Sequence, residues 1–182
     1  MSSSSEPSPS IWSSCRSVAS LRARQLTGTH LLRIDGYSAG NRLVLAGECI
    51  ESRAFTAGGQ RWQLSYYPNG HDSFGRGGAA ASVELELKDV SSKEDSATAA
   101  YRLSILDGDG NPAFSYTVGP QRFDKASGYS HRVDVLAAPE ERRAALRLAE
   151  DDDSLSVRCD VSVTKFEKES RIKCYLRKLL LD

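Results

Sequence analysis

The stretch THLLRIDGYS (residues 29–38), followed further on by ESRAFTAGGQRWQLSYYPNG (51–70), carries the pattern that decides the fold. Its apolar residues recur at every second position, which is the period of a strand with one buried face. They are Leu32 and Ile34 in the first part, and Trp62, Leu64 and Tyr66 in the second. Gly58 and Gly59 supply residues that tolerate positive φ where the chain must reverse. The stretch therefore predicts three strands and a tight turn.

The same period of two recurs in three later segments, 83–88, 101–105 and 155–164. In each segment an aliphatic face alternates with a polar or charged one, so each predicted sheet has one wet side. Antiparallel sheets allow this arrangement, whereas parallel sheets are covered on both faces. We therefore expect an all-β protein, an antiparallel β-sandwich in which two sheets close on each other.

The rest of the chain divides by composition into two tails and one helix. Residues 1–26 are rich in serine and predict a disordered tail, although their arginines are also typical of an organelle transit peptide. The sandwich domain is expected over 27–164, interrupted by a helix at 139–149 that begins with proline and two glutamates. In the tail at 165–182 apolar residues repeat with helical spacing, which predicts an amphipathic C-terminal helix.

The first of these segments, together with YRLSILDGDGN (101–111) and LSVRCDVSV (155–163), resembles the MATH domain, the TRAF-like β-sandwich of plant MATH-BTB proteins. The resemblance runs from about Thr27 to Thr164. It implies a sandwich of roughly seven to eight antiparallel strands. It also implies a protein-binding function, in which a shallow groove receives short, extended, Ser/Thr-rich segments. In that family a neighbouring BTB domain recruits a cullin, so that the bound protein is ubiquitinated.

The resemblance also suggests five positions for the peptide-binding groove. These are Tyr101, Glu86, Gln121, Tyr129 and His131. Tyr101 keeps an aromatic residue of the family, whereas Glu86 replaces a tyrosine that often stands there. Tyr129 and His131 fall at a tryptophan and a phenylalanine of the family, and Gln121 falls at another aromatic position. We therefore expect a more polar groove with a different binding motif. Core burial for Tyr101 and surface solvation for Glu86 are the plain alternatives.

Other classes of function find little support in the composition. The chain carries 24 basic and 24 acidic residues, so no net field favours nucleic acid or an anionic membrane. Three scattered histidines and four cysteines without a CxxC pair predict neither a metal site nor a cofactor. Asp107 to Asn111 resembles a calcium loop, but Pro112 stands where that loop needs glycine. We expect a hairpin turn there, a buried reduced Cys159, and no enzyme.

The expected function is thus that of a protein-binding module in the cytoplasm or nucleus, or in an organelle under the transit-peptide alternative. The chain ends 18 residues after the last predicted strand, so we expect no BTB domain and no direct cullin binding. Its expected partners are substrate proteins recognised through short peptide motifs, together with full-length MATH-BTB relatives. Two alternatives remain open. In the first, the chain is a truncated paralogue that is non-functional or that competes with full-length MATH-BTB adaptors. In the second, it is a β-sandwich that binds a small ligand.

Overall fold

The computed structural model describes residues 21–71, 80–89, 96–150 and 152–168. Within the chain, Gln25–Lys165 forms one compact unit, and the paragraphs below concern that unit. The described residues outside it are the outer ends of the first and last strands. Most of the predicted N-terminal tail and the predicted C-terminal helix lie outside the described residues.

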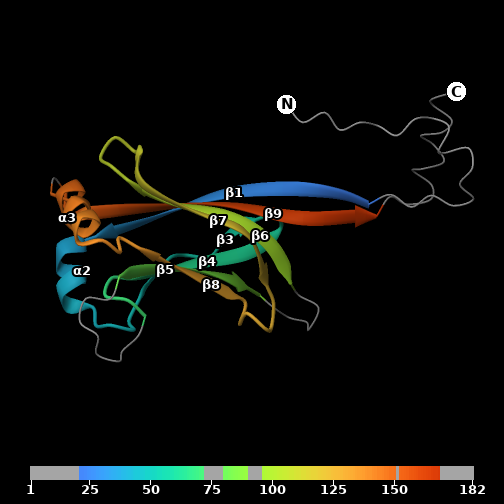
Figure 1. The fold of residues 1–182 in the computed structure, drawn as a ribbon, viewed down its shortest axis with the longest axis horizontal. Coiled ribbons are helices and arrows are strands. Elements are labelled where there is room, and N and C mark those ends of the chain that lie inside the picture. The colour runs from blue at the N-terminus through green and yellow to red at the C-terminus, as the bar shows by residue number, and fades with distance from the viewer. Residues whose placement is uncertain (1–20, 72–79, 90–95, 151, 169–182) are drawn as a thin grey trace, which may run out of the picture. The chain divides into compact units, whose positions relative to one another are not determined.

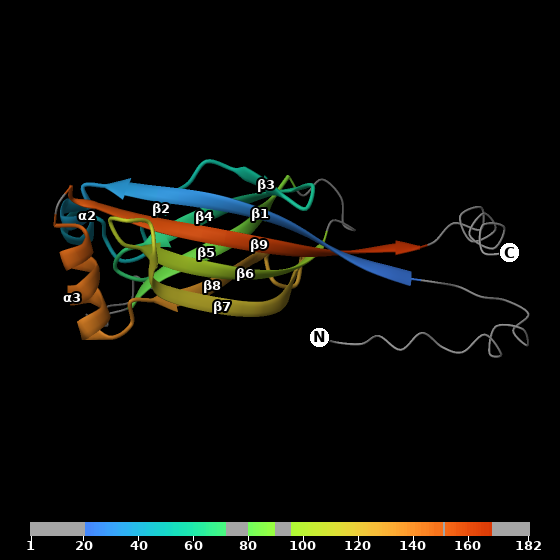
Figure 2. The same ribbon diagram turned by 90° about the horizontal axis from the view of Figure 1, so that it is seen from above.

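Four long strands form the upper layer in Figure 1, and Figure 2 shows them side by side. They are β1 (Leu21–Asp35), β9 (Ser154–Lys168), β6 (Ala97–Leu106) and β7 (Pro112–Phe123), in that spatial order. β6 pairs antiparallel with both of its neighbours. The last strand of the chain therefore lies inside this sheet, between β1 and β6.

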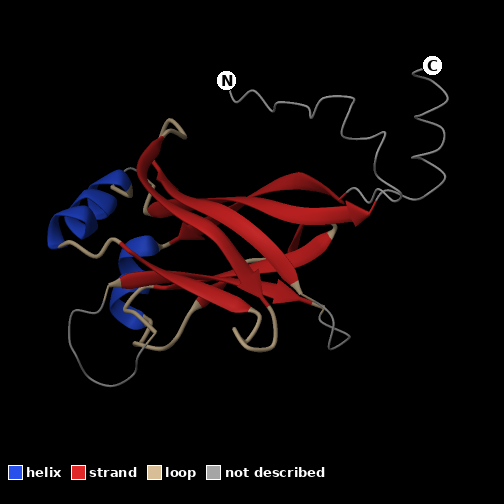
Figure 3. Ribbon diagram, turned by 45° about the vertical axis from the view of Figure 1, so that its right-hand side comes forward, coloured by secondary structure: helices blue, strands red, loops and turns tan. Residues whose placement is uncertain are grey.

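Five strands form the second layer (Figure 3). They are β2 (Ile50–Glu51), β4 (Gln60–Tyr67), β5 (Ala81–Lys88) and β8 (Ser130–Val135) in order, with β3 (Phe55–Ala57) also paired to β4. The register sets Trp62 opposite Leu87, so both side chains point to the inner face. The expected antiparallel β-sandwich is confirmed.

The core lies between the two layers and is built from the alternating residues of both. Trp62 is fully buried, meets Phe123 edge to face with ring centroids 4.9 Å apart, and donates from Nε1 to the carbonyl of Ala57 at 3.0 Å. That hydrogen bond satisfies the one polar group of the largest core residue. Cys159 is also buried, as its place in the β9 alternation predicts.

The predicted turns adopt the conformations that their residues allow. Gly58 and Gly59 have φ of 60° and 72° in the turn from β3 to β4. In the β6–β7 turn, the Asp107 carboxylate accepts hydrogen bonds from the backbone N–H groups of Asp109 and Asn111, at 3.1 and 2.8 Å. The hairpin prediction for this segment is confirmed.

The predicted helix at 139–149 is present as α3 (Pro139–Leu148), with the Glu141 carboxylate accepting from the Ala138 N–H. The expectation that it would be the one helix of the domain is wrong. A second helix, α2 (Tyr37–Leu43), follows β1. Its sequence contains Gly40, a poor helix former, but Asp153 accepts hydrogen bonds from the Tyr37 and Ser38 N–H groups. Tertiary anchoring therefore outweighs propensity here.

The first strand also begins earlier than expected, at Leu21 instead of Thr29. The residues from Leu21 to Gln25 are all exposed, so they carry no alternation from which the start could be read. The last strand likewise extends past Thr164, to Lys168. The compact unit spans Gln25–Lys165, and the expected domain bounds of 27–164 stay a prediction.

Candidate functional site

The two sheets end on the same side of the sandwich, in the edge strands β7 and β8. Just after β8, the Leu136 N–H donates to the hydroxyl of Tyr116 on β7 at 2.9 Å. At the other end, the loop from Asp124 to Tyr129 joins the two strands directly. Two edge strands from different sheets therefore lie opposite each other along one side of the fold.

The inner sides of these strands carry a set of partly buried side chains, which we call the β7–β8 margin. It consists of Phe114, Tyr116, Val118, Tyr129, His131 and Val133. The register explains their direction, because Tyr116 pairs with the buried Leu103, and His131 pairs with the buried Leu85. The core thus continues to the surface here, and five of the six side chains are apolar or aromatic.

β7 carries no charge over most of its length. From Pro112 to Gln121 there is no Asp, Glu, Lys or Arg, and in the described residues no strand pairs with its outer edge. The other long edge strand, β1, carries Arg33 and Asp35, and β8 carries Arg132 and Asp134. Charged side chains on an edge oppose the addition of another strand. β7 lacks charged side chains over this length, and apart from Pro112 and Pro120, which have no N–H, it keeps its outer backbone groups available.

A side-chain hydrogen bond also joins the two sheets at the margin. The hydroxyl of Tyr101 on β6 lies 2.6 Å from Nδ1 of His131 on β8, and the rings meet edge to face. Tyr101 is only 3% exposed, whereas His131 is half-buried. Burial is the main cause of the raised pKa of the Tyr101 phenol. The tyrosine therefore stays neutral and keeps its proton to donate.

The structure brings together only some of the five residues suggested for the groove. Tyr101 and His131 are in direct contact, and Gln121 lies on the inner side of β7, since it pairs with the buried Ala99. Tyr129 immediately precedes β8, has φ of 62°, and packs partly against the core. Glu86 lies on the opposite, outer face of the second sheet.

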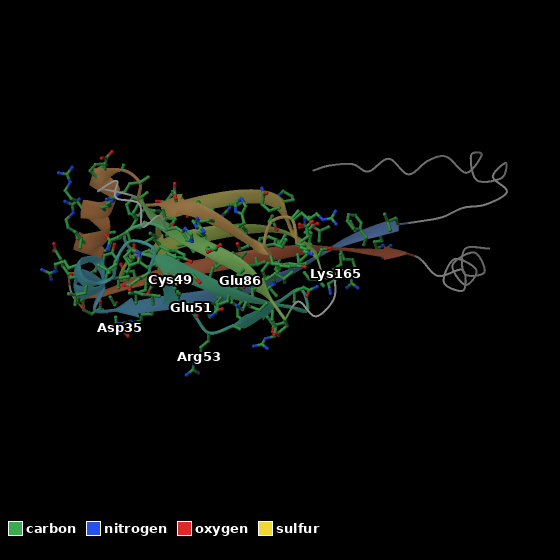
Figure 4. All side chains as sticks on the ribbon, turned by 90° about the horizontal axis from the view of Figure 1, so that it is seen from below. Asp35, Cys49, Glu51, Arg53, Glu86 and Lys165 are labelled. Carbon is green, nitrogen blue, oxygen red and sulfur yellow. The ribbon has the colours of Figure 1, made fainter. Side chains whose placement is uncertain are left out.

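That outer face is seen in Figure 4, where Glu86 is labelled together with Cys49 and Glu51. Glu86 is contacted there by Lys88, whose Nζ lies 3.1 Å from both carboxylate oxygens. The contact is between two half-exposed side chains on one strand. Such surface pairs contribute little to stability. Whether Glu86 takes part in ligand binding stays a prediction.

A second cluster on the same outer face joins three strands around Glu84. The hydroxyl of Tyr67 donates to Glu84 at 3.1 Å, and the Arg132 guanidinium lies 3.5 Å from the same oxygen. Arg132 also stacks 5.6 Å above the centre of the Tyr67 ring. Burial opposes ionisation of Glu84, but hydrogen bonds from Ser130 and Tyr67 and the charge of Arg132 together lower its pKa. All of its partners are thus internal, which makes this a structural network.

Two further findings bear on other functions. In the described part of the chain, no group of three or more His, Cys, Asp or Glu residues is placed to hold a metal ion. Among the same residues, no helix is long and apolar enough to cross a bilayer.

Reasoning from the sequence missed four residues of the margin. These are Phe114, Tyr116, Val118 and Val133. A signal for three of them was present, because PAFSYTV at 112–118 alternates apolar with small or polar residues. The sequence could not show that β7 would be an edge, since alternation gives the face of a strand but not its neighbours.

Comparison with known proteins agrees with this geometry. A family model described as the MATH domain matches residues 29–161, well over half of the chain. No curated protein matches the chain. The MATH domain is a protein-interaction module and is not typically enzymatic.

Proposed function

Because the chain belongs to the MATH domain family, we propose that it binds short, extended segments of other proteins along β7. The observation that carries the proposal is the uncharged outer edge of β7 beside the apolar β7–β8 margin. A peptide in strand conformation pairs with such an edge through its main chain, which supplies affinity without regard to sequence. Its alternate side chains then supply the specificity.

The two faces of β7 set different requirements for the bound segment. Side chains that point inward meet the margin, where Tyr116, Val118 and Val133 favour apolar anchors. Side chains that point outward lie beside the hydroxyls of Ser115 and Thr117, which suit a Ser/Thr-rich segment. The proposed ligand therefore alternates anchoring and small polar residues.

In the cell, the proposed ligands are substrates of ubiquitin ligases. This step rests on the resemblance to MATH-BTB adaptors, whose MATH domain selects proteins for a cullin-based ligase. Full-length relatives of that kind are the proposed second class of partner. If both bind the same segments, this chain competes with those adaptors for them.

The test compares the wild-type protein with Thr117→Lys, which places a positive charge on the outer face of β7. The matched control is Ser162→Lys, which adds the same side chain to the outer face of the same sheet, but on the internal strand β9. A display library of Ser/Thr-rich peptides is selected on the wild-type protein, and the affinities of enriched peptides are measured by fluorescence anisotropy.

We expect Thr117→Lys to weaken binding about tenfold and Ser162→Lys to leave it unchanged. Tyr129→Ala should weaken it as well, because an aromatic side chain of the margin is removed. Tyr101→Ala is a poor probe, since this residue is buried and its truncation leaves a cavity. Equal affinity for wild type and Thr117→Lys would contradict binding along β7.

A further inference from the structure

We propose that the β7–β8 margin selects a peptide whose side chain at the level of His131 accepts a hydrogen bond. The class of residue is Asp, Glu, Asn or Gln. This inference rests on the proposed function and adds the chemistry of one anchoring position. It follows from the protonation pattern of the Tyr101–His131 pair, from the place of the free ring nitrogen and from the groups around it.

The first step concerns the proton of the Tyr101 hydroxyl. The side chain is almost completely buried, and in the described residues its hydroxyl has one hydrogen-bond partner, Nδ1 of His131 at 2.6 Å. A buried hydroxyl that makes no donor bond loses free energy. The Tyr101 O–H therefore donates to Nδ1, and the proton of the neutral imidazole is carried by Nε2.

The second step is that Nε2 is a donor in every state of the ring. In the neutral tautomer set by Tyr101, Nε2 carries the proton, and in the imidazolium both nitrogens do. Nε2 is thus never an acceptor while Tyr101 holds Nδ1. A ligand that meets this nitrogen must present a carboxylate, a carbonyl or another lone pair.

The third step is that Nε2 is within reach of a ligand. His131 lies on the edge strand β8 and is half-buried. In the described residues the unpaired buried side-chain atoms are His30 Nε2, Tyr66 Oη and Ser82 Oγ, and His131 Nε2 is not one of them. Since no described group bonds to it either, the nitrogen lies at the surface of the margin.

The fourth step concerns the surroundings of this donor. Val133 follows it by two residues on the same side of β8, and Val118 lies opposite Tyr101 on β7. No inner position of either edge strand within the margin carries a charge. A leucine docked here would cover Nε2 and leave its N–H unpaired, whereas an acceptor side chain would pair it. Sites built to hydrogen-bond a ligand reject analogues that lack the partner.

With no carboxylate among these inner side chains of the margin, an acidic ligand meets no opposing charge from them.

The experiment selects a phage-displayed library of random dodecapeptides in parallel on four full-length proteins. They are the wild type, His131→Phe, Tyr101→Phe and a control, His71→Gln, which changes a histidine in the segment after β4. Thermal unfolding of each protein is recorded first. Tyr101→Phe removes a single oxygen atom, so it keeps the test valid if His131→Phe fails to fold.

We expect wild type and His71→Gln to enrich peptides with one position rich in Asp, Glu, Asn or Gln, flanked two residues away by apolar residues. His131→Phe should enrich Leu, Ile or Phe at that position, and it should bind a wild-type peptide about tenfold more weakly. Tyr101→Phe should relax the preference, because Nδ1 is then free to carry the proton and Nε2 to accept.

Three results would overturn the inference, and they fall into two groups. If wild type and His131→Phe enrich the same residues, or if His131→Phe weakens all peptides equally, the side-chain preference is absent and only the proposed function stands. If His131→Phe weakens all peptides equally, a main-chain carbonyl of the peptide, and not a side chain, accepts the hydrogen bond from His131 Nε2. If the folded wild type enriches no peptide over the starting library, the proposed function fails and the inference falls with it.

Discussion

At Gly58 a hydrogen atom occupies the place where any other residue would carry a Cβ. An added Cβ would collide with the side chain of Val163 on β9, where Cγ2 lies only 2.7 Å away. The same residue has φ of 60°, in the region that residues with a Cβ rarely adopt. The turn from β3 to β4 can therefore press against β9 only because this position is glycine.

We expect Gly58→Ala to lower the free energy of unfolding by about 2 kcal/mol or more, from backbone strain and overpacking together. Gly110→Ala is the matched control, since Gly110 also has positive φ but faces open space. Chemical denaturation of both variants separates the two causes. Equal losses in the two single variants would show that the contact with Val163 is unimportant.

Residues such as Gly58 also show what the sequence can and cannot reveal. Its role in a turn could be predicted, because glycine pairs in short links between alternating segments favour positive φ. Its contact with β9 could not, since the two lie more than a hundred positions apart in the sequence. Tyr101 is similar. Its place in the strand alternation indicated a core position, but its hydrogen bond to His131 depends on how the two sheets face each other.

Among the elements, β4, β5 and β8 are joined on their outer face by the network around Glu84. Its carboxylate is bound from both neighbouring strands, by Tyr67 and by Arg132. The side chain is 17% exposed, and its partners would be left partly unpaired if the charge were lost. The network therefore holds the edge strand β8 to the rest of its sheet by side-chain bonds as well as by the backbone ladder.

We expect Glu84→Gln to destabilise the protein by about 1 kcal/mol at pH 7. Because folding lowers the pKa of Glu84, its contribution is fully present above the unfolded value near 4.5 and disappears as the pH falls through the folded value. Denaturation between pH 7 and pH 3 should therefore show the variant and the wild type converging in acid. Glu86→Gln, on the same face of the same strand, should change little. A constant difference at every pH would exclude the ionised carboxylate as the cause.

Strands and helices differed in how well the sequence predicted them. The long strands were predictable because their inner and outer residues alternate, and α3 because proline and glutamates begin it. α2 was not, since its stability depends on the hydrogen bonds from Tyr37 and Ser38 to Asp153, a residue far along the chain. The sequence also could not show which of the five suggested groove residues lie together. The alternation of a strand and the resemblance to a family do not determine which strands become the edges of the sheets.

For the molecule as a whole, the decisive feature is that β9 lies between β1 and β6. Its inner residues Leu155, Val157, Cys159, Val161 and Val163 are all essentially buried. Removal of this strand takes away a continuous section of the core, leaves β1 without a neighbour and exposes one edge of β6, which keeps only β7. The sheet cannot compensate by local rearrangement, because the other described strands with this alternation already hold their own places in the two sheets.

We expect a chain that stops at Asp153 to lack cooperative unfolding and to show a weakened strand signal by circular dichroism. A synthetic peptide of residues 154–168 should restore both when added to the truncated chain, since the pairing of β9 is not covalent. The same peptide with Val157 and Val161 replaced by Asp is the control and should not. A truncated chain that unfolds cooperatively by itself would contradict this dependence on β9.

The position of β9 has a consequence for how the protein is made. A ribosome that has released the first hundred and fifty or so residues has delivered β1 and β6, but the strand that joins them is still in the peptidyl-transferase centre or the exit tunnel. Until β9 has left the tunnel, the nascent chain presents β1 without a neighbour, an open edge of β6 and an open apolar layer, which are features that cause aggregation. Chaperone dependence during translation is therefore expected to be greater than the stability of the finished sandwich would suggest.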